Sequence, residues 1–355
     1  MIGISLLTLD PWTVGGTQTH ARELVRALAQ HGTLDYRVYV SDIAPEAGGD
    51  LRTVVVPEFP AGRSRLGRIA GLTRATIADG RLRRVLDRDH AVAFHFPLTV
   101  VLPHVSAPAT TTIHDLQHEA YPQFFSRPQL SYRRHVYGRS VRSSRIVITV
   151  SEHVRDDLVE RLGYPADRVR VIHHGVDHER FTLEAAGERE PFLLYPANWW
   201  PHKNHELLLE AFASVRRERP ELRLVLTGSD HPAGLPDGVT SLGRVSDERL
   251  VELYRSAAAL VFPSLYEGFG LPPLEAMACG CPVAVSRVAA LPEVCGDAAV
   301  YFDPTSAETI AQGILDVLDR PAAGGPEHAA RFTWEEFAHR HDAVYRELAG
   351  GDDPG

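Results

Sequence analysis

Short apolar runs rich in valine, isoleucine, leucine and phenylalanine alternate along most of the chain with longer stretches in which apolar residues recur at helical spacing. This alternation predicts parallel strands connected by helices, the pattern of a doubly wound α/β sheet. In the first half we expect strands at residues 2–9, 36–40, 52–56, 91–96, 110–113 and 145–150. In the second half we expect strands at 192–196, 222–227, 240–242, 258–262, 282–286 and 299–302.

The length of the chain indicates two domains. At 355 residues with 44% hydrophobic content, the chain exceeds the size at which one core normally keeps growing. We place the first domain at residues 1–180, a polar linker at 181–190, the second domain at 191–333 and a final helix at 334–349.

Composition limits the classes of function. The formal net charge of −9 argues against a general nucleic-acid binder, which needs a basic face for phosphates. Cys279, Cys281 and Cys295 are too few and too clustered for a disulfide framework, and no cysteine and histidine set has the spacing of a structural zinc site. We see no leader and no apolar run long enough for a membrane span, so we expect a cytoplasmic protein that is soluble or peripheral.

The stretch from Ser264 to Gly280 carries the clearest candidate chemistry. It follows an expected strand, passes through Gly268 and Gly270, and then takes a helical pattern. Such a loop directs backbone N–H groups and the positive end of a helix at an anionic ligand such as a diphosphate. Glu267 and Glu275 flank the turn and can accept hydrogen bonds from sugar hydroxyls. The alternative is that both are solvated surface charges.

Three weaker signals lie at the ends of other expected strands. Gly15 and Gly16 follow the first strand, His114 and Asp115 follow the strand at 110–113, and Lys203 precedes a helix at 205–218. Open α/β sheets bind ligands at such strand ends, and a lysine there can meet a diphosphate. A tight turn, a histidine that caps a strand and an exposed lysine are the plainer interpretations.

Two charge patterns need separate interpretation. Asp87-Arg88-Asp89 has a metal-binding form, but it ends a basic helical run far from the glycine-rich loop, so we expect no metal there. Arginines are dense at residues 63–88 and 127–145. A solvated helix face is the usual meaning of such runs, and an anionic membrane or a diphosphate-linked acceptor is the alternative.

The segment from Glu267 to Glu275, Glu-Gly-Phe-Gly-Leu-Pro-Pro-Leu-Glu, resembles the paired-glutamate signature of retaining glycosyltransferases of family 4. The following residues 276–283, 291–294 and 296–299 also match it. Residues 112–116, with Tyr121-Pro122 and Phe124-Phe125, resemble the subgroup that includes many bacterial mannosyltransferases. The resemblance implies an α/β GT-B fold, with two Rossmann-like domains facing each other across a cleft and a final helix crossing back to the first domain.

The resemblance also implies roles for residues. His114 and Glu267 would orient the sugar, and Lys203 would meet the leaving diphosphate. The implied donor-binding residues are Gly16, Asn198, Arg244, Gly268, Phe269, Gly270, Leu271 and Glu275, with Glu275 on the ribose, and Gly15 and Asp115 lie on the acceptor side. Family members usually pair the lysine with a nearby arginine, but none lies between Phe192 and Lys203. Asn198 or His202 takes its place, and Arg244 is a further substitute.

The implied activity is retaining transfer of a hexose from a nucleotide diphosphate sugar to an acceptor hydroxyl, without a metal or another cofactor. The donor phosphate would itself take the acceptor proton. The mannosyltransferase-like subgroup favours GDP-mannose, and a UDP- or dTDP-sugar is the alternative donor. A sugar-nucleotide epimerase or a non-catalytic sugar-nucleotide-binding protein is the alternative function. Both a lipid-linked acceptor at the inner face of the membrane and a soluble acceptor stay open.

Overall fold

The computed structural model describes residues 1–12, 15–59, 76, 78–183 and 189–350. The chain divides into two compact units: unit 1 contains Met1–Gly175 and Trp334–Gly355, and unit 2 contains Val176–Thr333. The division falls a few residues before the boundary predicted at residue 180. Val176 donates its N–H to the carbonyl of Phe332 at 3.0 Å, and Phe181 packs edge-on against Tyr254, which ties this segment to unit 2. The predicted linker lies partly, at 184–188, outside the described residues.

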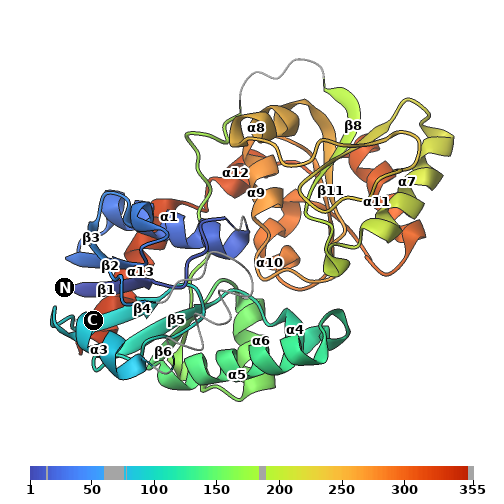
Figure 1. The fold of residues 1–355 in the computed structure, drawn as a ribbon. Helices are drawn as coiled ribbons and strands as arrows, with labels where there is room; N and C mark the ends of the chain where they lie inside the picture. The colour runs from blue at the N-terminus through green and yellow to red at the C-terminus, as the bar shows by residue number, and fades with distance from the viewer. Residues whose placement is uncertain (13–14, 60–75, 77, 184–188, 351–355) are drawn as a thin grey trace. The chain divides into compact units, whose positions relative to one another are not determined.

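Unit 1 is built on a parallel sheet with the strand order β3-β2-β1-β4-β5-β6-β7 over its described residues (Figure 1). Its strands are β1 (Ile2–Leu6), β2 (Tyr36–Val40), β3 (Arg52–Val55), β4 (Ala93–Phe96), β5 (Ala109–Ile113), β6 (Ile146–Thr149) and β7 (Val169–Val171). Its helices are α1 (Gly16–His31), α3 (Asp79–Asp87), α4 (Gln117–Ala120), α5 (Arg127–Ser143), α6 (Glu152–Leu162) and α13 (Trp334–Leu348), with 3-10 turns at Pro45–Gly48, Pro122–Phe124 and Ala166–Arg168.

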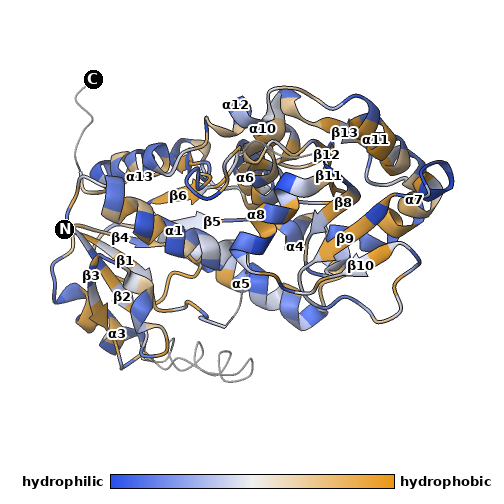
Figure 2. Cartoon of the chain, turned by 90° about the horizontal axis from the view of Figure 1, so that it is seen from above, coloured by the Kyte–Doolittle hydropathy of each residue, from blue (hydrophilic) through white to orange (hydrophobic). Residues whose placement is uncertain are grey.

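Alternation along the strands gives unit 1 two apolar layers. On one face, Ile4 and Leu6 of β1 share a core cluster with Leu24 of α1 and Phe337 of α13. On the other face, aromatic side chains of β2 and β4 pack with Leu82 of α3. The helices carry apolar and polar bands in Figure 2, as expected for elements that cover a sheet on one side and meet solvent on the other.

The helix α13 follows unit 2 in the sequence but completes the core of unit 1, where it packs beside α1 (Figure 1). Its buried Asp342 accepts hydrogen bonds from the N–H of Thr33 at 2.7 Å and the hydroxyl of Thr33 at 2.8 Å, and also from the hydroxyl of Tyr36. These contacts fix α13 to the segment between α1 and β2.

Unit 2 repeats the architecture with the strand order β10-β9-β8-β11-β12-β13. Its strands are β8 (Glu190–Pro196), β9 (Arg223–Thr227), β10 (Val239–Ser241), β11 (Ala257–Phe262), β12 (Val283–Ser286) and β13 (Val300–Phe302). Its helices are α7 (His205–Glu218), α8 (Asp247–Ser256), α9 (Leu271–Ala278), α10 (Leu291–Cys295), α11 (Ala307–Asp319) and α12 (Gly325–Ala329), with 3-10 turns at Pro201–Lys203 and Gly296–Ala298.

The predicted doubly wound α/β architecture is confirmed in both units, and all strand pairs of the described residues are parallel. The largest error at a strand end is in β1, which stops at Leu6 although the apolar run continues to Leu9. Leu9 donates its N–H back to the carbonyl of Leu6 at 3.0 Å, so the chain turns there while its side chains stay buried. None of the described helices is long and apolar enough to cross a bilayer.

Candidate functional site

The strand order of unit 2 reverses its direction between β8 and β11. From β8 the chain proceeds to β9 and β10 on one side, and from β11 it proceeds to β12 and β13 on the other. Loops that leave the carboxyl ends of two such strands diverge and leave a crevice, which is where open α/β sheets bind ligands. Lys203 lies in the loop after β8, and Glu267 lies in the loop after β11.

Hydrogen bonds to the backbone hold the loop of Lys203 in place. The hydroxyl of Tyr195 donates to the carbonyl of Lys203 at 2.6 Å. The next residue, Asn204, has a φ of 60° and donates from its side chain to the carbonyl of Pro263 at 3.1 Å. The N–H of Leu265 donates to the carbonyl of His202 at 2.8 Å, which joins the two loops directly.

Lys203 and Glu267 form an ion pair at this switch point. The Nζ of Lys203 donates to Oε1 of Glu267 at 2.6 Å, and the side chains are 14% and 13% exposed. The same ammonium lies 5.2 Å from the ring centre of Phe262. The structure therefore brings together two of the three residues that the sequence predicts to be catalytic, and it places a positive and a negative group side by side.

The glycine-rich loop ends in a backbone conformation that favours glycine. Gly270 precedes α9 with a φ of 115°, and a Cβ at this position would lie 2.8 Å from Cδ2 of Leu291. Pro272 and Pro273 follow in the first turn of α9 and have no N–H. The N–H groups of Gly270 and Leu271 are thus the ones that the start of α9 offers to an anion.

Glu275 is half-buried inside α9, where Oε2 accepts a hydrogen bond from the hydroxyl of Tyr254 at 2.9 Å. Burial, followed by the nearby Glu275 carboxylate, raises the pKa of Tyr254 well above its usual value, so the phenol keeps its proton and donates. Phe269, by contrast, is 5% exposed and packs edge-on against Phe332. Its ring belongs to the core of unit 2, so only its backbone is placed to meet a ligand.

The other donor-side predictions in unit 2 lie in the loops after β8, β10 and β11. Asn198 accepts hydrogen bonds through Oδ1 from the N–H of Ser229 at 2.8 Å and its hydroxyl at 3.0 Å. Gly228, with a φ of 124°, makes this approach possible, because a Cβ there would lie 2.6 Å from the carbonyl oxygen of Ala197. Gly268 lies half-buried beside Glu267, and Arg244 is exposed in the loop after β10.

The remaining predicted residues belong to unit 1. His114 directly follows β5 and donates from Nε2 to the carbonyl of Pro97, just after β4, at 2.7 Å. Burial lowers the pKa of His114, so the ring is neutral at neutral pH and its Nδ1 can accept a hydrogen bond. Asp115 accepts through Oδ1 from the N–H of Gln117 at 3.1 Å. Gly15 and Gly16 lie at the start of α1, where Gly15 precedes the first helical residue.

Sequence reasoning missed His20 and His174, which gather around His114. Nδ1 of His20 lies 3.2 Å from Nδ1 of His174, and the ring centres of His20 and His114 are 4.6 Å apart. Burial, followed by the neighbouring His114, holds the pKa values of His20 and His174 well below the usual range. The one sequence signal was the position of His20 one turn into α1 from the glycine pair.

The aspartates of the metal-like motif have structural partners. Asp87 accepts hydrogen bonds from the hydroxyl of Ser106 at 2.7 Å and from Arg83 at 3.4 Å. Asp89 accepts from the hydroxyl of Tyr39 at 2.8 Å and pairs with Arg37. These contacts account for both carboxylates as parts of the fold.

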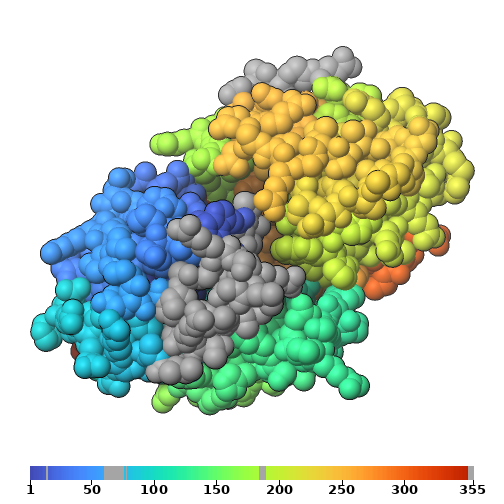
Figure 3. All heavy atoms as spheres, in the orientation of Figure 1, coloured from blue at the N-terminus to red at the C-terminus, as the bar shows by residue number. Residues whose placement is uncertain are grey.

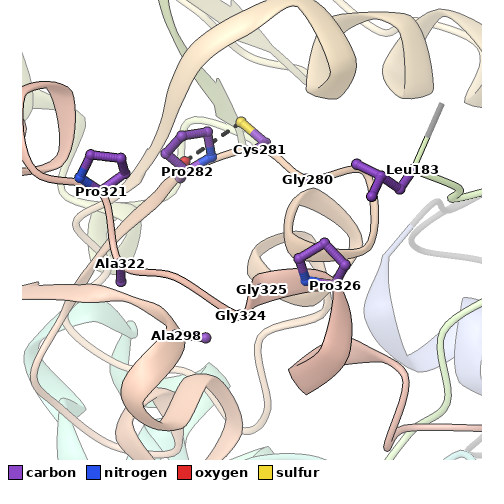
Figure 4. Close-up of a pocket in the computed structure, with 10 residues that line it drawn as sticks. All are labelled: Leu183, Gly280, Cys281, Pro282, Ala298, Pro321, Ala322, Gly324, Gly325 and Pro326. Atoms are coloured by element: carbon purple, nitrogen blue, oxygen red, sulfur yellow. Dashed lines mark hydrogen bonds between the residues drawn. The ribbon is translucent and has the colours of Figure 1, made fainter. Parts of the chain in front are cut away.

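A cavity of about 280 Å³ in unit 2 is lined by Leu183, Gly280, Cys281 and the segment 321–326 among others (Figure 4). Prolines, glycines and alanines make up most of this wall. None of the residues predicted to bind substrate lines it. Its lining lacks charged side chains, so the switch-point loops are the better candidate for an anionic ligand.

Family models match nearly the whole chain. Residues 14–180 match the model described as Glycosyltransferase Family 4, and residues 178–335 match the model described as Glycosyl transferases group 1. Among curated proteins, the O-antigen chain mannosyltransferase B of Escherichia coli is 33% identical over 284 residues, which span 72% of this chain and 74% of the relative. The O-antigen chain mannosyltransferase RfbU of Salmonella typhimurium is 30% identical, with 76% and 77% covered.

Solved glycosyltransferase structures share the fold. Sucrose-phosphate synthase from Thermosynechococcus elongatus superposes with a TM-score of 0.76 at 22% identity, covering 99% of both chains. WaaG, a glycosyltransferase involved in lipopolysaccharide biosynthesis, gives a TM-score of 0.67 at 18% identity, covering 99% of this chain and 100% of its own. HepE of Anabaena, in complex with UDP-glucose, gives 0.64 at 15% identity, with 98% and 94% covered. The predicted GT-B fold is confirmed by these likenesses.

Proposed function

Because the chain belongs to glycosyltransferase family 4, we propose that it transfers a mannosyl group from GDP-mannose to an acceptor hydroxyl with retention of configuration. The names of the relatives support mannose as the sugar. The observation that carries the proposal is the contact of Lys203 with Glu267 at the switch point of unit 2. The contact supports the proposal, because a cation suited to the leaving diphosphate lies beside a carboxylate suited to accept hydrogen bonds from the sugar.

The diphosphate, the sugar and the ribose of the donor each have a proposed partner in the protein. Lys203 and the N–H groups of Gly270 and Leu271 would bind the diphosphate and stabilise the charge that grows as it leaves. Glu267 would accept from sugar hydroxyls, and Glu275 from the ribose. These groups supply the positive charge that a metal supplies in other folds, so we propose that transfer requires no metal.

The proposed reaction forms a bond between the acceptor oxygen and the anomeric carbon, and it breaks the bond from that carbon to the diphosphate. Both events occur on the same face of the sugar, which retains the configuration. The departing phosphate oxygen takes the proton of the acceptor hydroxyl. His114 would accept a hydrogen bond from the sugar through Nδ1, because its Nε2 proton is held by the carbonyl of Pro97.

A donor panel tests the proposal. The wild-type chain is incubated with GDP-mannose, UDP-glucose, UDP-galactose or a dTDP-sugar, with simple mannosides as acceptors, and the anomeric configuration of the product is read by NMR. The expected result is an α-mannoside formed from GDP-mannose alone. A β-linked product would contradict retention, and transfer only from a UDP- or dTDP-sugar would contradict the assigned donor. Lys203→Met serves as the inactive control.

We further propose that the acceptor is lipid-linked or otherwise anionic, because exposed arginines lie on α3 and α5. Both helices reach the surface of unit 1 (Figure 3). Internal contacts reduce the number available: Arg83 binds Asp87 and Ser106, and Arg134 binds Glu119. Arg81 stays exposed on α3. The first arginine-rich run also contains Arg63, Arg65, Arg68 and Arg74, which lie outside the described residues.

Vesicle co-sedimentation tests the acceptor side. Anionic vesicles should bind the chain at low salt and lose it at high salt, because nearby arginines each contribute about 1 kcal/mol to binding an anionic surface. Arg81→Glu should weaken this binding. Arg320→Glu, at an exposed position of unit 2, is the matched control and should bind as wild type. Equal and negligible binding to anionic and neutral vesicles would favour a soluble acceptor.

A further inference from the structure

Three histidines converge in unit 1 from distant parts of the sequence. His20 comes from α1, His114 from the end of β5 and His174 from the loop after β7. One ring nitrogen of each lies within 4.8 Å of the other two. Over the described residues, this is the one group of three or more histidine, cysteine or carboxylate side chains with that proximity. The fold therefore gathers three nitrogen donors around one point.

The separation of the nearest pair matches a metal geometry. Nδ1 of His20 and Nδ1 of His174 share a hydrogen bond of 3.2 Å, and a cation bound to both would replace the proton between them. Zinc bound to histidine nitrogens at 2.0–2.1 Å in a tetrahedron places those nitrogens about 3.3 Å from one another. The nitrogen of His114 lies within 4.8 Å of the other two, so a shift of at most about 1.5 Å closes the same triangle.

Two observations indicate that the rings can act as ligands. Nε2 of His114 donates to the carbonyl of Pro97 at 2.7 Å, so Nδ1 carries the lone pair. A metal-bound histidine typically has its other ring nitrogen held by a backbone carbonyl in this way. His20 is 1% exposed, and its Nε2 has no hydrogen-bond partner among the described residues. Nδ1 of His20 is the nitrogen that faces His174, so it is the one that would bind the cation.

We propose that His20, His114 and His174 form a binding site for a borderline-soft divalent cation, best matched by Zn²⁺, with the fourth coordination position open. Imidazole nitrogens favour zinc and its neighbours over Mg²⁺ and Ca²⁺, which select oxygen ligands. The ring of Phe337 contacts His20, and the ring of Trp334 contacts His174.

The cation would inhibit transfer. It would occupy the Nδ1 lone pair of His114, which the proposed function assigns to a hydrogen bond from the sugar. This consequence rests on the proposed function, whereas cation binding itself does not. The open fourth position would be taken by water or by an acceptor hydroxyl.

A cobalt titration tests the site without any measurement of transfer. The full-length wild-type chain is treated with chelator, freed from it and titrated with Co²⁺, whose visible absorption is intense in a tetrahedral site and weak in an octahedral one. We expect an intense spectrum that saturates at one ion per chain and disappears when Zn²⁺ is added. Mg²⁺ should leave the spectrum unchanged.

Single substitutions assign the ligands. His20→Phe keeps a ring in the aromatic cluster but removes both nitrogens, and His174→Asn keeps a small polar group. Each should weaken cobalt binding by at least about 10- to 100-fold, which is the effect of losing even an outer-shell partner. His339→Asn, at an exposed position of α13, is the matched control and should bind as wild type.

Failure of a variant to fold, seen by circular dichroism, leaves the wild-type titration to decide. A wild-type chain with no tetrahedral spectrum would overturn the proposal, as would wild-type affinity in folded His20→Phe and His174→Asn. Zinc binding without inhibition of transfer would keep the site but contradict the role of His114 in sugar binding.

Discussion

Nζ of Lys203 donates a hydrogen bond to the carboxylate of Glu267, and the two charges neutralise each other within the loops that follow β8 and β11. To bind substrate with its charged atoms, either side chain would have to give up part of its contact with the other. In the proposed function, a diphosphate that approaches Lys203 would compete with Glu267, and sugar hydroxyls would then replace the ammonium as donors to the carboxylate. The ion pair therefore keeps both groups in place and compensated before substrate arrives.

Replacement of Lys203 by methionine should lower kcat and also stability. Loss of a preorganised donor to a developing anion typically costs about 100- to 1,000-fold in rate. The carboxylate of Glu267, which is mostly buried, loses its partner, which costs about 1–3 kcal/mol. Turnover and urea unfolding measure the two effects. Lys203→Met with Glu267→Gln should recover stability but not turnover, and recovered turnover would contradict the role of the ammonium.

Glu275→Gln should raise the KM for the donor more than it lowers kcat. A ribose contact is equal in the ground and transition states, so its loss weakens binding uniformly. Tyr254→Phe removes only the phenol that donates to Glu275 at 2.9 Å, so it should have a smaller effect of the same kind. Steady-state kinetics with varied donor distinguish these results. An unchanged donor KM in Glu275→Gln would refute the ribose contact.

Chelator should leave transfer fully active, because Lys203 and the N–H groups at the start of α9 are proposed to neutralise the diphosphate. The measurement is initial rate in excess EDTA, with Mn²⁺ added back in a parallel assay. Loss of activity that manganese restores would contradict a metal-independent mechanism.

Gly270→Ala should destabilise unit 2 and reduce donor binding. The backbone at Gly270 has a φ of 115°, and the added Cβ would lie 2.8 Å from Leu291. Backbone strain of this kind costs about 1–3 kcal/mol. Gly80→Ala in α3 is the matched control. The added Cβ would have no heavy atom within 4 Å, and the backbone at Gly80 does not have a positive φ. Equal melting temperatures for the two variants would show that the loop relaxes.

Stability should fall as the pH decreases below 6.5, and His205 should contribute to this loss. Burial, followed by the nearby His231, lowers the pKa of His205 from 6.5 to about 3. Between these two pH values His205 is protonated in the unfolded chain but not in the folded chain. The free energy of unfolding therefore falls by at most about 1.4 kcal/mol for each pH unit. His205→Phe preserves a ring against Trp199, 4.4 Å away, and should reduce the pH dependence of urea unfolding. An unchanged slope would show that His205 is protonated in the folded state.

Local sequence patterns predicted most of the fold. The helix at 205–218 and the helix at 334–348 were located correctly, because each has sustained helical periodicity between clear boundaries. The strand at 2–9 was predicted too long, because buried side chains continue past Leu6 after the backbone has left the sheet. Burial and strand pairing usually coincide, and here they do not.

The individual site residues were easier to predict than their contacts. Lys203 and Glu267 were predicted from their positions after expected strands together with the family resemblance, but their pairing depends on β8 and β11 being neighbours in the sheet. The histidine cluster was missed for the same reason. His20 and His174 are 154 positions apart in the sequence. A histidine on the apolar face of a helix is usually interpreted as an ordinary core residue. Contacts between distant segments come from sheet order, which local patterns do not contain.

The docking of α13 through Asp342 has a consequence for synthesis on the ribosome. Unit 2 is continuous in the sequence, so it can fold as soon as it has left the exit tunnel. Unit 1 begins first but stays without one helix of its core until the whole of unit 2 has been translated. Until then the face of α1 that α13 covers is exposed to the nascent chain's surroundings, so the half that is made first is completed last.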